Sequence, residues 1–176
     1  MGRQFPNAAL QLPEIAEYRN DAVDSLTHFL QPAYQQANPR FLSYSPADFT
    51  KLLRDRVEET DLHSSFSILA AVEAALRVDY LIRVTGKRKD PLSRAFRDIY
   101  KEKGENARLD DDLLDTWLQF HPEFRALIGE FRAALHFRHW LAHGRYWVRP
   151  RNGRFDYISL YTLASFLFSN FPLHHD

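Results

Sequence analysis

The sequence predicts an all-α fold, and three observations support this expectation. Apolar residues recur at spacings of three and four along most of the chain, which is the period of one face of an α-helix. Residue pairs that favour helix starts, such as Ser45-Pro46 and Asp90-Pro91, stand before several of these stretches. Turn residues fall singly between the stretches, without a repeat or a long linker, so residues 1–176 are expected to form a single domain.

The first 45 residues are predicted to be a helical extension. Within residues 1–45, one helix is expected from about Pro13 to Gln36, with loosely spaced apolar positions that indicate packing. The residues Ser45, Pro46 and Asp48 then combine a capping hydroxyl, a preset first turn and a negative charge suited to the helix dipole. They predict the start of a long helical stretch, with a break near Asp61, that ends at about Thr85.

Residues 46–170 are predicted to form the core of the bundle. After the first long stretch, a helix begins at Asp90-Pro91, and a short helix is capped by Asp110. A longer helix is expected from Pro122 to Gly144, with apolar residues at spacings of three and four. The last helix, about Ile158 to Asn170, is apolar nearly all round, so we expect other helices to enclose it.

One segment has the pattern of strands. Tyr146-Trp147-Val148 and Phe155-Asp156-Tyr157 flank the pair Asn152-Gly153, which readily adopts the positive φ angles of a tight hairpin turn. The sequence therefore predicts a short basic hairpin before the last helix.

The composition excludes several kinds of chemistry. The chain has no cysteine, which removes disulfides, thiolate catalysis and cysteine-type zinc sites. Lys and Arg together number 23, as do Asp and Glu, so any contact with nucleic acid must come from a local basic patch. The N-terminus lacks a signal-peptide pattern, and no stretch approaches the roughly 20 apolar residues that span a bilayer. We therefore expect a cytoplasmic protein without membrane contact.

Two charged residues interrupt apolar helix faces. Arg138 falls beside the stripe that contains Leu135 and Leu141, and a guanidinium buried there needs an acidic or phosphate partner. Glu73 interrupts the stripe of Leu69 to Tyr80 in the same way. We predict that Glu73 orients Arg138. The alternative interpretation is that each side chain reaches solvent from the edge of its stripe.

The histidines that follow Arg138 indicate a composite site. His139 and His143 are four residues apart and share one helix face, whereas Arg138 and His143 are five apart and diverge by roughly 140° on an ideal helix. One chain therefore aligns Arg138 and His143 poorly. If the helix paired with its copy about a two-fold axis, both pairs of residues could line one cleft, so the spacing favours a homodimer.

The segment Arg138-His139-Trp140-Leu141-Ala142-His143, followed by Gly144 and Tyr146, resembles the Arg-x4-6-His signature of HEPN domains. HEPN proteins are helical bundles that carry this motif at the end of a late helix, before one more packing helix. The resemblance covers about residues 46–170. It implies a HEPN-like helical bundle, to which residues 1–45 add an extra N-terminal helix.

The resemblance also implies an activity. Many HEPN proteins are endoribonucleases of toxin, abortive-infection and other defence systems, and they act as homodimers without a metal or other cofactor. By this resemblance His143 is the general base or acid on the RNA 2′-hydroxyl, Arg138 stabilises charge on the phosphate, and His139 holds the polar position after the arginine. Imidazoles titrate near neutrality and guanidinium groups bind phosphate with paired hydrogen bonds, which suits cleavage to a 2′,3′-cyclic phosphate.

Two further partners follow from the resemblance, namely an antitoxin and a nucleotidyltransferase. In some members of the family a nucleotidyltransferase modifies a tyrosine two residues after the histidine. Here the tyrosine lies three residues after His143, at Tyr146, so the spacing departs from that pattern.

A local basic patch is expected beside the end of this helix. No acidic residue occurs between Phe131 and Phe155, where arginines accumulate next to two aromatic residues able to stack on bases. The predicted RNA-binding residues are Arg145, Tyr146, Trp147, Arg149, Arg151 and Arg154. The alternative interpretation is a solvated basic loop at a helix C-terminus, where cations are favoured in any case.

Two other interpretations use the same residues. His136, His139 and His143 lie within roughly 60° on one helix face, a spacing that metal-binding imidazoles can adopt, although no carboxylate nearby in sequence completes a site. A HEPN module could also lack nuclease activity and bind RNA, a nucleotide or a partner protein, because a fold tolerates loss of function at its site. RNA cleavage in the presence of a chelator would distinguish a metal-independent nuclease from both the metal site and the inactive binding module.

Overall fold

The computed structural model describes residues 10–31, 38–148 and 155–174, and it confirms the all-α prediction, since none of the residues in these ranges lies in a strand. The α-helices are α1 (Leu12–Phe29), α3 (Pro46–Thr85), α4 (Pro91–Lys103), α5 (Asp115–Phe120), α6 (Arg125–Ala142) and α7 (Tyr157–Asn170). Short 3-10 turns cover Pro39–Phe41, Gly104–Asn106 and Pro122–Phe124, and a π-helical turn covers Leu109–Leu114.

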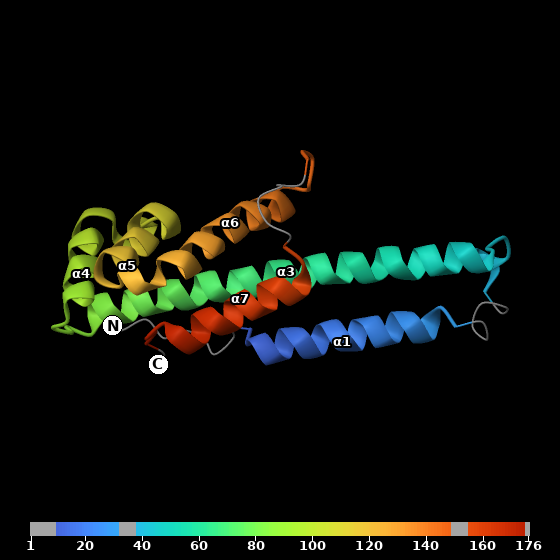
Figure 1. The fold of residues 1–176 in the computed structure, drawn as a ribbon, viewed down its shortest axis with the longest axis horizontal. Coiled ribbons are helices and arrows are strands. Elements are labelled where there is room, and N and C mark those ends of the chain that lie inside the picture. The colour runs from blue at the N-terminus through green and yellow to red at the C-terminus, as the bar shows by residue number, and fades with distance from the viewer. Residues whose placement is uncertain (1–9, 32–37, 149–154, 175–176) are drawn as a thin grey trace.

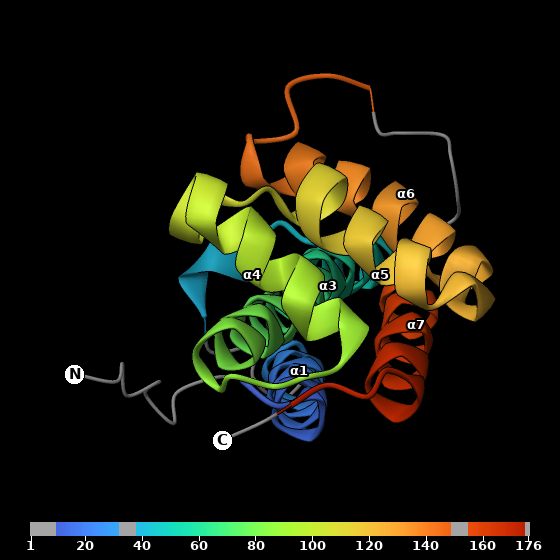
Figure 2. The same ribbon diagram turned by 90° about the vertical axis from the view of Figure 1, so that its left-hand side faces the viewer.

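Helix α3 is the axis around which the other helices pack (Figure 1). Helix α1 runs antiparallel along it, α7 lies in front of it, and α6 lies on the side away from α1. Helices α4 and α5 cover the C-terminal end of α3, and Figure 2 shows α1, α6 and α7 around α3 as seen from that end. The N-terminal part of α3 extends beyond the other helices with α1 alone beside it.

Side-chain caps begin α3 and α4 where the sequence predicts, and α7 begins with a cap at Asp156, a residue that the sequence places in a hairpin strand. The hydroxyl of Ser45 accepts a hydrogen bond from the Asp48 N–H, and Asp90 and Asp156 cap α4 and α7 through the N–H groups of Ser93 and Ser159. These acceptors satisfy N–H groups that have no partner within the first helical turn.

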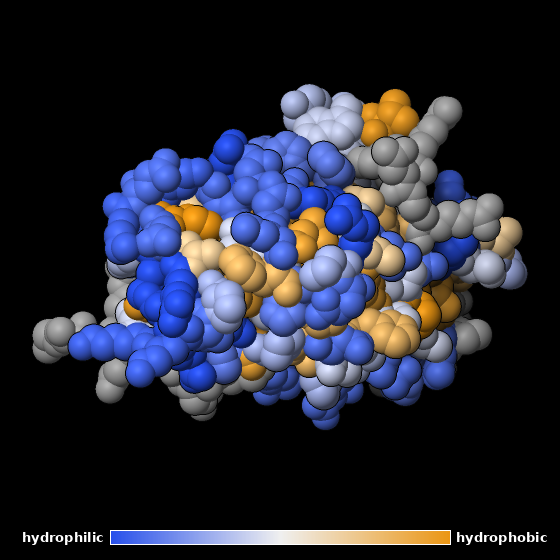
Figure 3. All heavy atoms as spheres, turned by 60° about the vertical axis from the view of Figure 1, so that its left-hand side comes forward, coloured by the Kyte–Doolittle hydropathy of each residue, from blue (hydrophilic) through white to orange (hydrophobic). Residues whose placement is uncertain are grey.

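A bulky core joins α3 to the four later helices. Its largest fully buried side chains are aromatic and come from α4, α5 and α6, namely Phe96, Trp117, Phe131 and Phe137. On the face shown in Figure 3, hydrophilic side chains surround smaller areas of hydrophobic ones. Among the described helices, none has the length and apolar character that crossing a membrane requires.

The break predicted near Asp61 is absent, because α3 is continuous over its 40 residues. The polar side chain of Asp61 joins two helices and does not mark the end of one. Its carboxylate accepts a hydrogen bond of 2.8 Å from Nε of Arg19 in α1, so it ties the two long helices together. The same guanidinium lies over the ring of Tyr157 at the start of α7, 4.9 Å from the ring centroid.

The strands of the predicted hairpin are also absent from the described residues. Tyr146–Val148 form no strand, and the carbonyl of Trp147 accepts a hydrogen bond of 2.8 Å from the indole N–H of Trp140 instead. On the other side, Asp156 is the N-cap of α7, which begins at Tyr157. The turn pair Asn152-Gly153 lies outside the described residues.

Two helices differ from their predicted extent or burial. Helix α1 ends at Phe29, with Leu30 as its C-cap, rather than continuing toward Gln36. Helix α7 is not enclosed on all sides: Ile158 is 68% exposed and Phe166 58% exposed, while the opposite face packs into the core.

Candidate functional site

The end of α6 holds the candidate catalytic residues, and Arg138 faces α3 from it. Nη2 of Arg138 lies 3.0 Å from Oε2 of Glu73, as the sequence predicts, and the guanidinium sits over the ring of Phe66, 5.6 Å from its centroid. Glu73 is half-buried, and its other oxygen accepts a 3.0 Å hydrogen bond from Nε of Arg77. One carboxylate therefore serves two guanidinium groups, so their combined charge stays positive.

The Arg138 contact is an ion pair rather than a well-formed hydrogen bond. Within the described part of the chain, Nε of Arg138 and Oε2 of Glu73 are buried and have no hydrogen-bond partner. A buried donor without an acceptor is unfavourable. Arg138 is thus held in position by charge, with hydrogen-bonding capacity left over.

His139 and His143 form an exposed pair at the last turn of α6. Their ring centroids are 4.1 Å apart, and the ring of Trp147 lies 5.7 Å from His139 and 6.3 Å from His143. The hydrogen bond from Trp140 to the Trp147 carbonyl fixes the backbone at this position. Tyr146, which is 81% exposed, meets the Trp147 ring edge-on at 4.4 Å. The imidazoles therefore lie beside an aromatic surface that solvent can reach.

A left-handed turn after α6 sends Arg145 back to α3. Gly144 has a φ of 75° and Arg145 a φ of 57°, a conformation that is common for glycine and rare for other residues. Nη1 and Nη2 of Arg145 each donate a 2.8 Å hydrogen bond to the carboxylate of Glu59. These hydrogen bonds hold the pKa of Glu59 below its ordinary range. His63 is a second partner, with Nε2 3.2 Å from Oε1 of Glu59.

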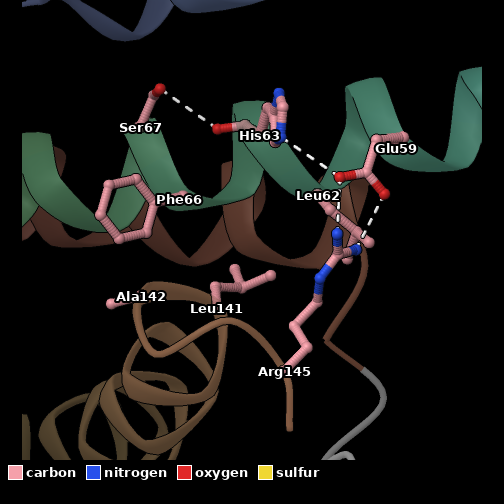
Figure 4. Close-up of a pocket in the computed structure, with 8 residues that line it drawn as sticks. All are labelled: Glu59, Leu62, His63, Phe66, Ser67, Leu141, Ala142 and Arg145. Atoms are coloured by element: carbon pink, nitrogen blue, oxygen red, sulfur yellow. Dashed lines mark hydrogen bonds and ion pairs between the residues drawn. The ribbon is translucent and has the colours of Figure 1, made fainter.

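The ion pair of Glu59 and Arg145 closes one end of a groove between α3 and the end of α6 (Figure 4). The groove has a volume of about 450 Å³. Apolar and polar side chains line it in equal number, namely Leu62, Phe66, Leu141 and Ala142 together with Glu59, His63, Ser67 and Arg145. The sequence places Phe66 on the apolar stripe of α3, which indicates packing rather than a groove, and nothing in the local pattern distinguishes Glu59 or His63 from other polar residues of α3.

The predicted basic patch is only partly described. Arg145 belongs to it but is paired with Glu59, and Arg132 faces α5 and the preceding turn, where it bonds to Asp110 and Asp115. Arg149, Arg151 and Arg154 lie outside the described residues. In the described segment, the aromatic side chains of Tyr146 and Trp147 are the part of the predicted RNA surface closest to the imidazoles.

The metal interpretation finds no third ligand. Across residues 10–31, 38–148 and 155–174, no group of three or more His, Asp or Glu side chains is placed to hold a metal ion. His136 is exposed on α6, but it does not join the ring contacts of His139 and His143.

Comparisons with known proteins identify no relative, because no family model, no curated protein and no solved structure matches the chain. The chemistry of the site follows from its own residues. These are two exposed imidazoles, a positioned guanidinium and an aromatic surface, which together suit a substrate that carries phosphate groups and flat rings.

Proposed function

We propose that the chain is a metal-independent endoribonuclease of the HEPN type, which cleaves RNA at a cleft shared by two copies. The observation that carries this proposal is the exposed imidazole pair of His139 and His143, which follows Arg138 on the same helix. Imidazoles exchange protons near neutral pH, and solvent-exposed imidazoles are open to a large substrate. The resemblance to the Arg-x4-6-His signature supports the same assignment.

The proposed reaction needs one base, one acid and one cation. His143 takes the proton of a 2′-hydroxyl, whose oxygen attacks the adjacent phosphorus. The 5′-oxygen of the next nucleotide leaves and takes up a proton from an imidazolium, which gives a 2′,3′-cyclic phosphate and a 5′-hydroxyl. Arg138 stabilises the negative charge that develops on the phosphate, and Glu73 positions Arg138. Because Glu73 is shared with Arg77, the positive charge is retained for the phosphate.

The direction of the side chains supports a composite cleft. Arg138 turns toward α3, whereas His143 is exposed at the helix end. In a homodimer related by a two-fold axis, each copy would present its exposed histidines to the other copy's arginine. Each half of the cleft would then need both chains.

A second candidate function is a HEPN module that binds RNA, a nucleotide or a partner protein without cleavage. The ion pairs favour this alternative, because Arg138 and Arg145 both have carboxylate partners within the same chain. A cation already paired contributes less to phosphate binding. Cleavage therefore has to be measured separately from binding.

The wider setting is part of the same proposal. A cytoplasmic toxin or antiviral-defence nuclease would be controlled by an antitoxin or by a nucleotidyltransferase partner. Tyr146 is 81% exposed, but it lies three residues after His143 rather than two, so its spacing departs from that of the tyrosine that such an enzyme modifies.

The test is RNA cleavage in the presence of excess chelator. We expect the wild-type protein to degrade a mixed RNA, while His143→Ala and Arg138→Ala each remove cleavage and keep the helical circular dichroism spectrum. His136→Ala is the matched control, because it removes another exposed imidazole from the same helix and should leave the rate unchanged.

Cleavage that the chelator abolishes would overturn the metal-independent mechanism. If the well-folded wild-type protein binds RNA but leaves it intact, the binding module becomes the better description.

A further inference from the structure

The groove between α3 and the end of α6 has the composition of a site for a flat, partly polar molecule. Leu62, Phe66 and Leu141 supply apolar walls, and the Glu59 carboxylate stands at one end (Figure 4). Its volume of about 450 Å³ falls within the range of small-molecule sites. The guanidinium of Arg138 sits over the ring of Phe66, which lines the groove, so the groove adjoins the cation proposed to bind the phosphate.

The charge state of Glu59 limits which molecule fits. The ordinary pKa of a glutamate already lies at about 4.3, so this carboxylate is ionised at neutral pH with or without Arg145, and it acts only as an acceptor. Among the four RNA bases, guanine alone presents two adjacent donors, N1–H and the N2 amino group, on its Watson–Crick edge. The exocyclic amines of adenine and cytosine stand next to a ring acceptor, which a carboxylate repels, and uracil offers one donor between two carbonyl groups.

The present partner of Glu59 can be exchanged. The side chains of Arg145 and Glu59 are 36% and 39% exposed, and ion pairs this open to water contribute little to stability. Arg145 extends from the turn that follows His143, and a guanidinium released from Glu59 becomes free to pair with a phosphate. A nucleotide can therefore replace the two hydrogen bonds between Arg145 and Glu59 with two new pairs. One pair joins the base to Glu59, and the other joins the phosphate to Arg145.

We propose that this groove is a guanine subsite, in which Glu59 accepts hydrogen bonds from the base while Phe66 and Leu141 contact its faces. The inference rests on the proposed function, since it assigns the base next to the cleaved phosphate. It makes Glu59 the residue that determines base preference.

The test is binding of the four nucleoside 3′-monophosphates to the full chain by isothermal titration calorimetry at constant salt. We expect 3′-GMP to bind at least about tenfold more tightly than 3′-AMP, 3′-CMP and 3′-UMP, the range of a good paired hydrogen-bond contact. Glu59→Gln should remove this preference, because it replaces one acceptor oxygen with a donor. Phe66→Leu should weaken all four nucleotides and leave their ranking unchanged.

Glu130→Gln is the matched control, because it changes an exposed glutamate on α6 outside the groove and should leave all four affinities unaltered. Equal affinities for the four nucleotides would overturn the proposal. So would the absence of binding, which is the outcome expected if a second copy of the chain fills the groove.

The two proposals fail in different ways. Binding of 3′-GMP that depends on Glu59, without any RNA cleavage, would keep the guanine subsite and remove the nuclease. Cleavage without base preference and without nucleotide binding would do the reverse.

Discussion

Single residues in this molecule show how a buried charge is made tolerable. Asp79 is fully buried, and burial raises the pKa of its carboxyl above the ordinary value. Both of its oxygens accept from Nε of Arg83 at 2.8 Å, and one also accepts from the backbone N–H of His174 at 2.9 Å. Nη2 of Arg83 in turn donates to the carbonyl of Pro172 at 2.8 Å. The pair thus fastens the segment after α7 to α3.

Asp112 gives a pH dependence that can be measured. It is buried, and a hydrogen bond from Lys103 and another from the backbone N–H of Arg108 lower its pKa from the ordinary value of 3.8. A carboxyl with a lowered pKa stabilises the fold above about pH 4, and this contribution disappears as the pH falls through the folded-state pKa. We expect Asp112→Asn to lower the melting temperature at pH 7 and to reduce its further decrease between pH 5 and pH 2.

Asp98→Asn is the control for Asp112, because Asp98 pairs with Lys101 on the surface, where both side chains are more than 70% exposed. Its melting curve should follow the wild type at every pH. Equal slopes for wild type and Asp112→Asn would contradict the role assigned to Asp112.

The sequence predicts some residue contacts and misses others for a physical reason. Glu73 and Arg138 were paired correctly because each interrupts an apolar stripe, and such stripes can be recognised in the sequence alone. The pairing of Arg145 with Glu59 depends on two successive left-handed residues after α6, and the sequence does not specify that turn. Asp110 was predicted to cap a helix, yet it bonds to Arg132, while Asp112 accepts the Arg108 N–H.

Elements are predicted well where a local signal defines them. The starts of α3 and α4 follow from their capping side chains, whereas Asp156, the cap of α7, was predicted to lie in a hairpin strand. The predicted break at Asp61 was wrong because this polar residue does not end the helix. It accepts a hydrogen bond from Arg19 of the helix packed beside it. The predicted hairpin was wrong in its described strands because other hydrogen bonds compete with strand pairing. The indole of Trp140 donates to the carbonyl of Trp147, and the N–H of Ser159 donates to Asp156 in the cap of α7.

The turn that ends α6 gives a prediction with an internal control. Gly144 has a φ of 75° and no atom within 4 Å of the position that a Cβ would occupy, so Gly144→Ala meets backbone strain and no clash. We expect it to cost about 1–2 kcal/mol of unfolding free energy. Gly129 lies inside α6 with equally open space, and Gly129→Ala should instead stabilise the fold by about 0.5–1 kcal/mol.

Urea denaturation of the two alanine variants measures both effects. Because Arg145 follows Gly144, only Gly144→Ala should also weaken binding in the groove. If both substitutions shifted stability in the same direction, the left-handed turn would not be the feature that holds Arg145 in place.

At the scale of the whole molecule, the arrangement around α3 separates the candidate catalytic groups. Helix α6 lies against α3 so that Arg138 meets Glu73 on the inner side, and the imidazoles of His139 and His143 remain at the outer end. Arg138 and the imidazoles therefore face different sides of α6, and this separation is the reason for proposing that a second copy completes the site.

Mixing two inactive variants tests whether the halves come from different chains. If the proposed homodimer forms, the Arg138→Ala and His143→Ala dimers each lack one of the two proposed catalytic groups, but a mixed dimer keeps Arg138 on one chain and His143 on the other. Random exchange makes about half of the dimers mixed. In each mixed dimer one of the two composite sites has both Arg138 and His143, and the other has neither, so recovery of roughly a quarter of the wild-type rate is expected. Sedimentation velocity at the assay concentration must show a dimer. A monomer, or a mixture that stays inactive after exchange has been verified, would mean that any activity arises within one chain, and Arg138 would have to leave Glu73 to reach the phosphate.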